Sequence, residues 1–235
     1  MVIDFHSHIL PGVDDGSHSM EETLGLLQME TQQGIREVVA TPHFYPQYTN
    51  PERFLLKRND AAQRVREQLA NRGDCPAIRL GAEVYYYDRM SHSEELRKLA
   101  IEGTEAILVE MPMGPWTDRM YQELANIQSN LGLQPIVADV DRYLGRFRDY
   151  GIPRRLAELP VLVQANAAFF LKNPGKALRM LQEQQIHLLG SDCHNLSDRK
   201  PNLGDAVALI QKKLGSEAIA WIQSGERAVF GVTED

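Results

Sequence analysis

Residues 2–16 read VIDFHSHILPGVDDG and begin with a short β-rich run, residues 2–6, whose end carries metal-ligand side chains. His6 and His8 stand two positions apart, so on an extended strand they face the same side and can bind one ion together. Asp14 and Asp15 follow in the next loop. The stretch therefore predicts a strand that leads into a metal site, and the rest of the chain repeats this plan.

Six further β-rich runs follow, and several are separated by helix-like stretches. They cover residues 37–41, 78–85, 106–111, 135–140, 161–165 and 186–190. A capping box, Ser19-x-x-Glu22, precedes one stretch with helical spacing of apolar residues, and similar stripes cover residues 120–131 and 203–214. Strands that alternate with helices predict an α/β fold with a mostly parallel sheet. Seven runs without a linker favour one domain, residues 1–235, and a closed TIM-like barrel.

The composition narrows the kind of protein. The formal net charge of -7 disfavours binding of nucleic acid or an anionic membrane through bulk electrostatics. No stretch approaches the roughly 20 apolar residues of a membrane span, and the first residues do not resemble a signal peptide. We therefore expect a cytoplasmic protein with no nucleic-acid partner and no membrane insertion.

Metal-ligand residues stand at or just after the end of nearly every run. In a parallel barrel such positions converge on one mouth. They are His6, His8, Asp14, Asp15, His43, Glu83, Glu110, Asp139, Asp141, Asn166, Asp192 and His194. Imidazole and carboxylate suit divalent manganese, iron, zinc or magnesium. The other histidines, His18, His92 and His187, are expected to be solvated or structural.

Four strings carry a resemblance to a known family: HSHILPGVDDG (6–16), ATPHF (40–44), GAEVYY (81–86) and SDCHNLSDR (191–199). They resemble the PHP (polymerase and histidinol phosphatase) superfamily, and most of all its bacterial protein-tyrosine phosphatases of the capsular and exopolysaccharide type. The resemblance implies a distorted (β/α)7 barrel with three divalent ions, most commonly manganese. It also implies that a metal-activated hydroxide attacks the phosphorus of phosphotyrosine.

The same resemblance implies which residues hold the ions and the phosphate. One ion would be held by His6, His8, Glu83 and Asp192. Glu83 would bridge to a second ion, held also by Glu110 and Asp139. The third ion would be held by Asp15, His43 and His194. Arg142 and Arg199 match the family's basic residues that meet the phosphate.

One position departs from the family pattern. The family usually has I-A-H-x-E-R-Y after the fifth strand, whereas residues 137–143 read VADVDRY, so that Asp139 replaces His and Asp141 replaces Glu. An ion held by Glu83, Glu110 and Asp139 would meet only carboxylates and water. Such a ligand set favours manganese or magnesium over zinc.

Other readings of the sequence remain open. Cys193 and Arg199 show the C-x5-R spacing of cysteine-dependent tyrosine phosphatases, but the intervening loop contains no glycine for a tight phosphate cradle, so we treat the match as coincidence. A small-molecule phosphatase of the histidinol phosphatase type is one alternative, and a catalytically weak metal-binding regulatory module is another. For the main reading, the family implies a phosphotyrosine protein as substrate, the tyrosine-rich tail of a bacterial autokinase that controls polysaccharide export.

Overall fold

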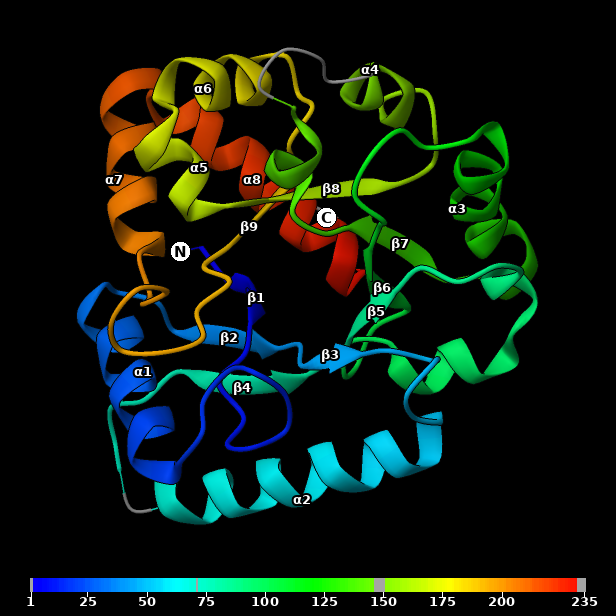
Figure 1. Ribbon diagram of the computed structural model, residues 1–235. Helices are drawn as coiled ribbons and strands as arrows, with labels where there is room; N and C mark the ends of the chain where they lie inside the picture. Colours follow the sequence, from blue (N-terminus) through cyan, green and yellow to red (C-terminus); the bar gives the residue numbers. More distant parts are fainter. Residues whose placement is uncertain (1, 71, 146–150, 232–235) are drawn as a thin grey trace.

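The computed structural model describes residues 2–70, 72–145 and 151–231, and its named strands pair in parallel throughout (Figure 1). A three-stranded sheet has the order β1-β2-β4, and a six-stranded sheet has the order β3-β5-β6-β7-β8-β9. The strands are β1 Asp4–Ser7, β2 Glu37–Ala40, β3 His43–Phe44, β4 Ala77–Leu80, β5 Glu83–Tyr85, β6 Ala106–Glu110, β7 Gln134–Val137, β8 Leu162–Asn166 and β9 Leu188–Gly190.

The third predicted run, residues 78–85, is not one strand. It divides into β4 and β5, and the facing chain divides at the same level into β2 and β3, which the sequence did not separate. Pro42 lies at this break and has no N–H to give to a ladder. Gly81 lies opposite, where an added Cβ would meet Ile101 and Thr41 at 3.3 Å. Both chains are therefore interrupted as strands at this level.

The last strand returns to the first, which curls the sheet. Ser7 forms a parallel bridge with Cys193, just beyond β9. The His8 N–H donates to the Cys193 carbonyl at 2.9 Å, and the Asp192 N–H donates to the His6 carbonyl at 2.8 Å. These bonds bring the segments that carry the first and last predicted ligands side by side.

Helices surround the curled sheet in Figure 1. They are α1 Met20–Gln32, α2 Pro51–Leu69, α3 Asp118–Leu131, α4 Ile152–Leu156, α5 Ala167–Lys172, α6 Pro174–Gln182, α7 Leu203–Leu214 and α8 Ser216–Phe230, with 3-10 turns at Met90–His92, Glu94–Leu99 and Val140–Tyr143. The predicted cap of α1 is present, because Ser19 Oγ accepts from the Glu22 N–H at 3.1 Å. Glu22 itself reaches one residue further back than predicted, to the N–H of His18.

Two hydrophobic clusters support the sheet. The larger one lies between strands and helices and runs from Val2 to Ile222. The smaller one gathers side chains from several strands with the C-terminal part of α8, and its members are Phe5, Val39, Ile101, Ala106, Leu108, Ile136, Ala138, Leu188 and Val229. On β6, Ala106 and Leu108 belong to this cluster, and Glu110 follows on the same face. Apolar layers thus lie below the strand end that bears the carboxylate.

The fold predictions are confirmed at the coarse level. The chain has an α/β fold with a curled parallel sheet, and each predicted run overlaps at least one strand. The sevenfold barrel count and the single domain over residues 1–235 stay predictions. Among the described residues, no helix combines the length and apolar character that a membrane crossing requires.

A substitution at Gly190 should test how closely β9 approaches β1. An added Cβ would lie 2.5 Å from the His6 Cβ and 3.0 Å from the His6 nitrogen. We expect Gly190→Ala to lower the free energy of unfolding by about 1–3 kcal/mol, as overpacking does. Gly175→Ala is the control, because nothing lies within 4 Å of its added Cβ. Equal urea midpoints for the two variants would contradict the close approach.

Candidate metal centre

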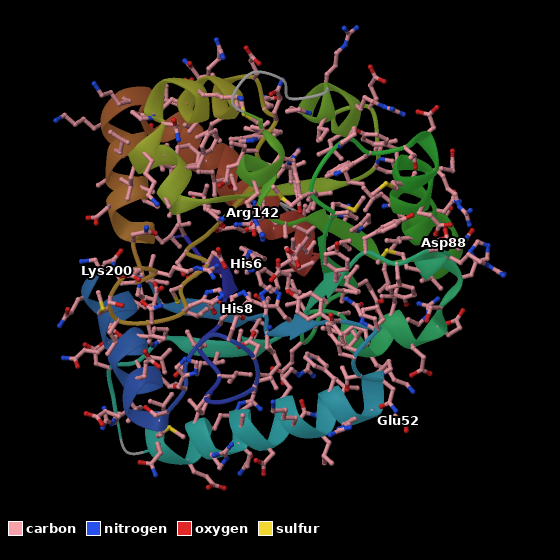
Figure 2. The ribbon with its side chains drawn as sticks, in the orientation of Figure 1. His6, His8, Glu52, Asp88, Arg142 and Lys200 are labelled. Atoms are coloured by element: carbon pink, nitrogen blue, oxygen red, sulfur yellow. The ribbon has the colours of Figure 1, made fainter. Side chains whose placement is uncertain are left out.

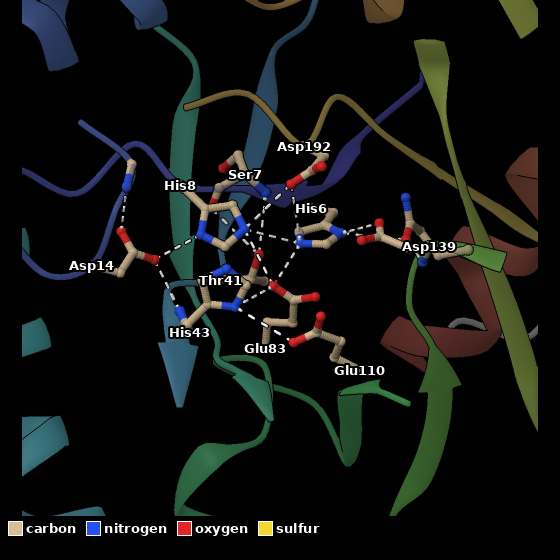
Figure 3. A network of polar contacts seen from close by, with 12 residues as sticks. His6, Ser7, His8, Asp14, Thr41, His43, Glu83, Glu110, Asp139 and Asp192 are labelled. Carbon is tan, nitrogen blue, oxygen red and sulfur yellow. Dashed lines mark hydrogen bonds and ion pairs between the residues drawn. The ribbon is translucent and has the colours of Figure 1, made fainter. Parts of the chain in front are cut away.

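The predicted ligands gather at the C-terminal ends of the strands (Figure 3). Four groups of their nitrogen and oxygen atoms each lie within 4.8 Å of one another. The groups are His6–His8–Glu83, His8–Asp15–His43–His194, His43–Glu83–Glu110 and His6–Asp139–Asp192. All nine residues that the resemblance assigned to the three ions therefore enter at least one group.

Glu83 lies at the middle of this arrangement. Its Oε2 is 3.1 Å from His6 Nε2, 3.3 Å from His8 Nε2 and 2.8 Å from His43 Nδ1. The residue is only 1% exposed. One buried carboxylate oxygen thus faces three imidazoles, as a bridging ligand would.

The outer group lies at the solvent side. Asp15 Oδ1 is 3.5 Å from His43 Nε2 and 3.8 Å from His194 Nε2. The two histidines are largely buried, whereas the Asp15 side chain is 68% exposed. This is the combination predicted for the third ion, with His8 as an additional neighbour.

The predicted second site has a different arrangement. Glu110 groups with His43 and Glu83, whereas Asp139 groups with His6 and Asp192. Asp139 Oδ1 lies 3.1 Å from His6 Nδ1, on the other nitrogen of the ring that faces Glu83. Between the two carboxylates lies Arg142, whose Nη1 donates to Glu110 Oε1 at 2.9 Å and to Asp139 Oδ2 at 3.1 Å. A cationic group therefore links Glu110 and Asp139.

The loop after β1 folds back to hold His8. Asp14 Oδ2 accepts from His8 Nδ1 at 2.6 Å and from the His43 N–H at 2.9 Å. Gly16 is required here, because an added Cβ would lie 2.2 Å from the His8 carbonyl oxygen. Asp14, which the resemblance assigned to none of the three ions, thus fixes the orientation of two of the nine assigned ligands.

The loop after β9 brings Arg199 back to Asp192. Asn195 Oδ1 accepts from the N–H groups of Ser197, Asp198 and Arg199, which closes the loop as an Asn side chain commonly does in turns. Arg199 Nη2 then donates to Asp192 Oδ2 at 2.5 Å.

Asp192 has a left-handed backbone with φ 53°, as Asp139 does with φ 51°. Asp tolerates this region better than most residues, which suits both strand ends.

Gln164 on β8 belongs to the centre and was missed from the sequence. Its Oε1 accepts from the Asp139 N–H at 2.8 Å and lies 3.3 Å from His6 Nδ1. Its Nε2 donates to Asn166 Oδ1 at 3.1 Å. The available signal was alternation, because Gln164 shares a strand face with Asn166, which had been noted.

The side chains fit divalent ions, because several buried atoms that could ligate have no hydrogen-bond partner. Both carboxylate oxygens of Glu83 accept no hydrogen bond, although imidazoles lie close. The other such atoms in the centre are His43 Nδ1, Glu110 Oε2, Asp139 Oδ1 and His194 Nε2. Buried polar atoms left in this way are costly, and a cation would satisfy them.

Protonation balances the charges of the centre when no metal is bound. Burial alone would lower the pKa of His8, but the carboxylates of Asp14 and Glu83 raise that pKa to about 10. Burial opposes charge on His6 as well, yet Glu83 and Asp139 raise its pKa well above the usual range. Burial and the neighbouring His8 instead lower the pKa of His194 to about 3. His194 is therefore a ready neutral ligand, whereas His6 and His8 must lose protons first.

The cysteine-dependent reading does not fit the position of Cys193. Its side chain is fully buried, and burial raises the pKa of the thiol well above its usual range. A reactive cysteine needs the opposite, an accessible thiol with a lowered pKa. Cys193 serves the junction of β1 and β9 instead, where its carbonyl accepts from the His8 N–H.

Comparison with known proteins places this chain in a family. The sequence profile described as "Capsular polysaccharide synthesis, CpsB/CapC" matches residues 2–227. The chain belongs to the CpsB/CapC family. The tyrosine-protein phosphatase CpsB of Streptococcus pneumoniae is 30% identical over 230 residues, with 92% of each chain covered. The tyrosine-protein phosphatase YwqE of Bacillus subtilis is 26% identical over 222 residues, with 92% of this chain and 86% of YwqE covered.

A solved structure shares the fold of this CpsB/CapC chain. It comes from work on YwqE of Bacillus subtilis and CpsB of Streptococcus pneumoniae, described there as unique metal-dependent tyrosine phosphatases. The TM-score is 0.84 at 23% sequence identity, with 98% of this chain and 94% of the other covered.

Metal binding should release protons at pH 7. This pH lies below the raised pKa values of His6 and His8, so both imidazoles hold a proton that a ligating nitrogen must lose. The affinity for manganese should therefore rise as pH rises. Calorimetric titration of chelator-stripped protein, in two buffers with different ionisation enthalpies, should give different heats. His92→Gln is the control, because it changes a histidine outside the centre, and it should behave as wild type. Identical heats in both buffers would contradict the release of protons from His6 and His8 on metal binding.

Proposed function

We propose that this CpsB/CapC protein is a metal-dependent tyrosine-protein phosphatase that acts in capsular polysaccharide synthesis. The observation that carries the proposal is the group of buried histidine and carboxylate atoms without hydrogen-bond partners, with two arginines at its edge. Curated relatives along most of the chain are named tyrosine-protein phosphatases. Together these findings support phosphate-ester hydrolysis as the reaction.

The proposal assigns three divalent ions, with manganese preferred, to the nine predicted ligands. The first would be held by His6, His8, Glu83 and Asp192, the second by Glu83, Glu110 and Asp139, and the third by Asp15, His43 and His194. When bound, such ions supply Lewis acidity and make water a stronger nucleophile at neutral pH. The second set requires Arg142 to release Glu110 and Asp139, which it links when no metal is bound. A set of three carboxylates would then favour manganese or magnesium over zinc.

Arg142 and Arg199 are proposed to bind the phosphoryl group. Each is partly exposed and partly paired with carboxylates of the centre, through Glu110 and Asp139 in one case and Asp192 in the other. A guanidinium has five donors, so each arginine can contact the centre and two phosphate oxygens at once. The charge of the arginines would offset negative charge that develops on the transferring phosphoryl group.

Aromatic side chains beside the centre support a phosphotyrosine substrate. Tyr45 stacks on His43 with ring centroids 5.0 Å apart, and its ring lies 5.6 Å from Tyr85 and 6.1 Å from Tyr48. Tyr48 is 81% exposed. Such a surface can contact the phenyl ring of a phosphotyrosine. The imidazole ring of histidinol phosphate could contact it as well, so the substrate assay below is what separates the tyrosine phosphatase from the histidinol phosphatase alternative.

The proposal also covers the protein substrate, the compartment and the detailed fold. We propose that the substrate is the tyrosine-rich tail of a bacterial tyrosine autokinase and that the protein meets it in the cytoplasm. We also propose that residues 1–235 form one domain with a distorted (β/α)7 barrel. The hydrogen bonds between the segments at β1 and β9 support this, because they bring the two ends of the sheet order together.

Substrate and metal assays separate this proposal from its competitors. Chelation should abolish hydrolysis of a phosphotyrosyl peptide, and manganese should restore it best. Faster turnover of histidinol phosphate than of the peptide would favour a small-molecule phosphatase. Turnover no better than that of the metal-stripped protein would favour a regulatory metal-binding module.

Ligand and phosphate-binding residues should give distinct defects. We expect His6→Ala to lose bound metal and turnover together. Arg199→Ala should keep its metal but lose turnover by about 10²–10³-fold, the usual effect of removing one charge-stabilising donor. Metal content by mass spectrometry and peptide hydrolysis under saturating manganese measure the two properties.

Arg179→Ala is the control for these variants, because it removes an exposed arginine on α6. It should match wild type in both measurements. If Arg199→Ala lost as much metal as His6→Ala, the separation of ligand and phosphate-binding roles would be wrong.

A further inference from the structure

A cleft of about 610 Å³ lies directly beside the candidate metal centre. Its inner part is formed by residues of the centre, among them Arg142, Asp192 and Arg199. Its outer part includes three lysines, Lys172, Lys176 and Lys200, which we call the lysine triad. In Figure 2, Arg142 is labelled above His6, and Lys200 is labelled to the left of both histidines. Because residues of the centre and the lysine triad line the same cleft, a ligand bound at the centre can extend along it toward the lysines.

The lysine triad has no carboxylate partner in the part of the chain that the structure describes. The ion pairs of that part involve arginines, histidines and Lys98, but none of the three. The cleft also contains Asp198 and Asp205, beside the two Asp residues of the inner part. Three unpaired lysines thus outnumber two outer carboxylates, on a protein whose formal net charge is -7.

Two helix ends add positive potential to the same cleft. Asn173 and Asn202, which precede α6 and α7, line it, and neither side chain caps its helix. The first N–H groups of a helix carry partial positive charge. Helix ends and lysines therefore act in the same direction, toward binding of anionic groups.

Apolar side chains form another part of the cleft. Phe169, Leu171 and Leu144 line it, and Leu171 is 39% exposed. A cleft with mixed polar and apolar lining suits a peptide, whose side chains offer both kinds of contact, better than a free inorganic anion. The occupant suggested by the lining is thus a peptide segment with negative charge.

We propose that this cleft binds anionic side chains next to the reacting phosphotyrosine, so that the lysine triad selects acidic peptide substrates. The inference rests on the proposed phosphatase function and adds the substrate class. The anionic groups are carboxylates or the phosphate of a second phosphorylated residue. Because the lysines line the outer part of the cleft and belong to none of the ligand groups, they act on substrate binding, so their effect falls on KM rather than kcat.

The experiment compares four phosphotyrosyl peptides on the manganese-loaded protein. One has neutral flanks, one has three glutamates before the phosphotyrosine, one has them after it, and one carries a second phosphotyrosine. At least one anionic peptide should have a KM about three- to tenfold below that of the neutral peptide, as a few exposed charge pairs allow. The preferred peptide identifies the side of the phosphotyrosine and the source of the charge.

A triple variant with Lys172→Gln, Lys176→Gln and Lys200→Gln should lose this preference with kcat kept. The matched control, Lys212→Gln with Lys213→Gln at the end of α7, should keep it, since neither residue lines the cleft. Metal content and thermal unfolding report whether the variants fold. A wild-type protein without preference, or a preference that survives in the triple variant, would overturn the proposal.

Failure of the phosphatase function would be visible separately, as no turnover of any of the four peptides. Fluorescence anisotropy of the same peptides, labelled and bound to the metal-loaded protein, then decides the inference alone. Tighter binding of an anionic peptide that the triple variant loses supports the cleft. Equal binding of all peptides overturns it.

Discussion

The buried carboxylate of Glu83 is the feature on which the rest of the site depends. It is 1% exposed, and neither oxygen accepts a hydrogen bond. A carboxylate in this position is tolerated only when cations offset its charge. Although burial alone would raise the pKa of Glu83, the nearby His6 holds it well below the usual range, so the group stays ionised. Protonated imidazoles supply the positive charge without metal, and divalent ions would replace them.

The fold serves this constraint by bringing distant strand ends together. β1 supplies His6, the chain just after β1 supplies His8, and β5 supplies Glu83. The return of the chain after β9 supplies Asp192 and His194 beside them. Gly190 permits this return because no side chain fits between β9 and His6. The apolar cluster beneath, closed by α8, excludes water from below. Reactants can approach from the mouth, where the arginines and the cleft lie.

Much of this could be predicted from the sequence, because ligand-type residues stand at strand ends and strand order follows the chain. The nine predicted ligands meet for that reason. The sequence could not show that residues 78–85 divide into two strands at Gly81, at the level where Pro42 interrupts the facing chain. Alternation along β8 could have pointed to Gln164, but the sequence could not show its contacts to Asp139 and His6, which join β8 to two other segments. The lysine triad was missed because its members come from three separate segments.

The central claim, that a metal centre is built on Glu83, is tested most directly by Glu83→Gln. This change keeps the shape of the side chain and removes its charge, so the histidines should remain in place. Metal content is measured by mass spectrometry after dialysis against manganese, alongside hydrolysis of a phosphotyrosyl peptide. We expect the variant to lose bound manganese relative to wild type and to lose turnover with it. Full metal content and wild-type turnover in a folded Glu83→Gln protein would contradict a metal centre organised by this carboxylate.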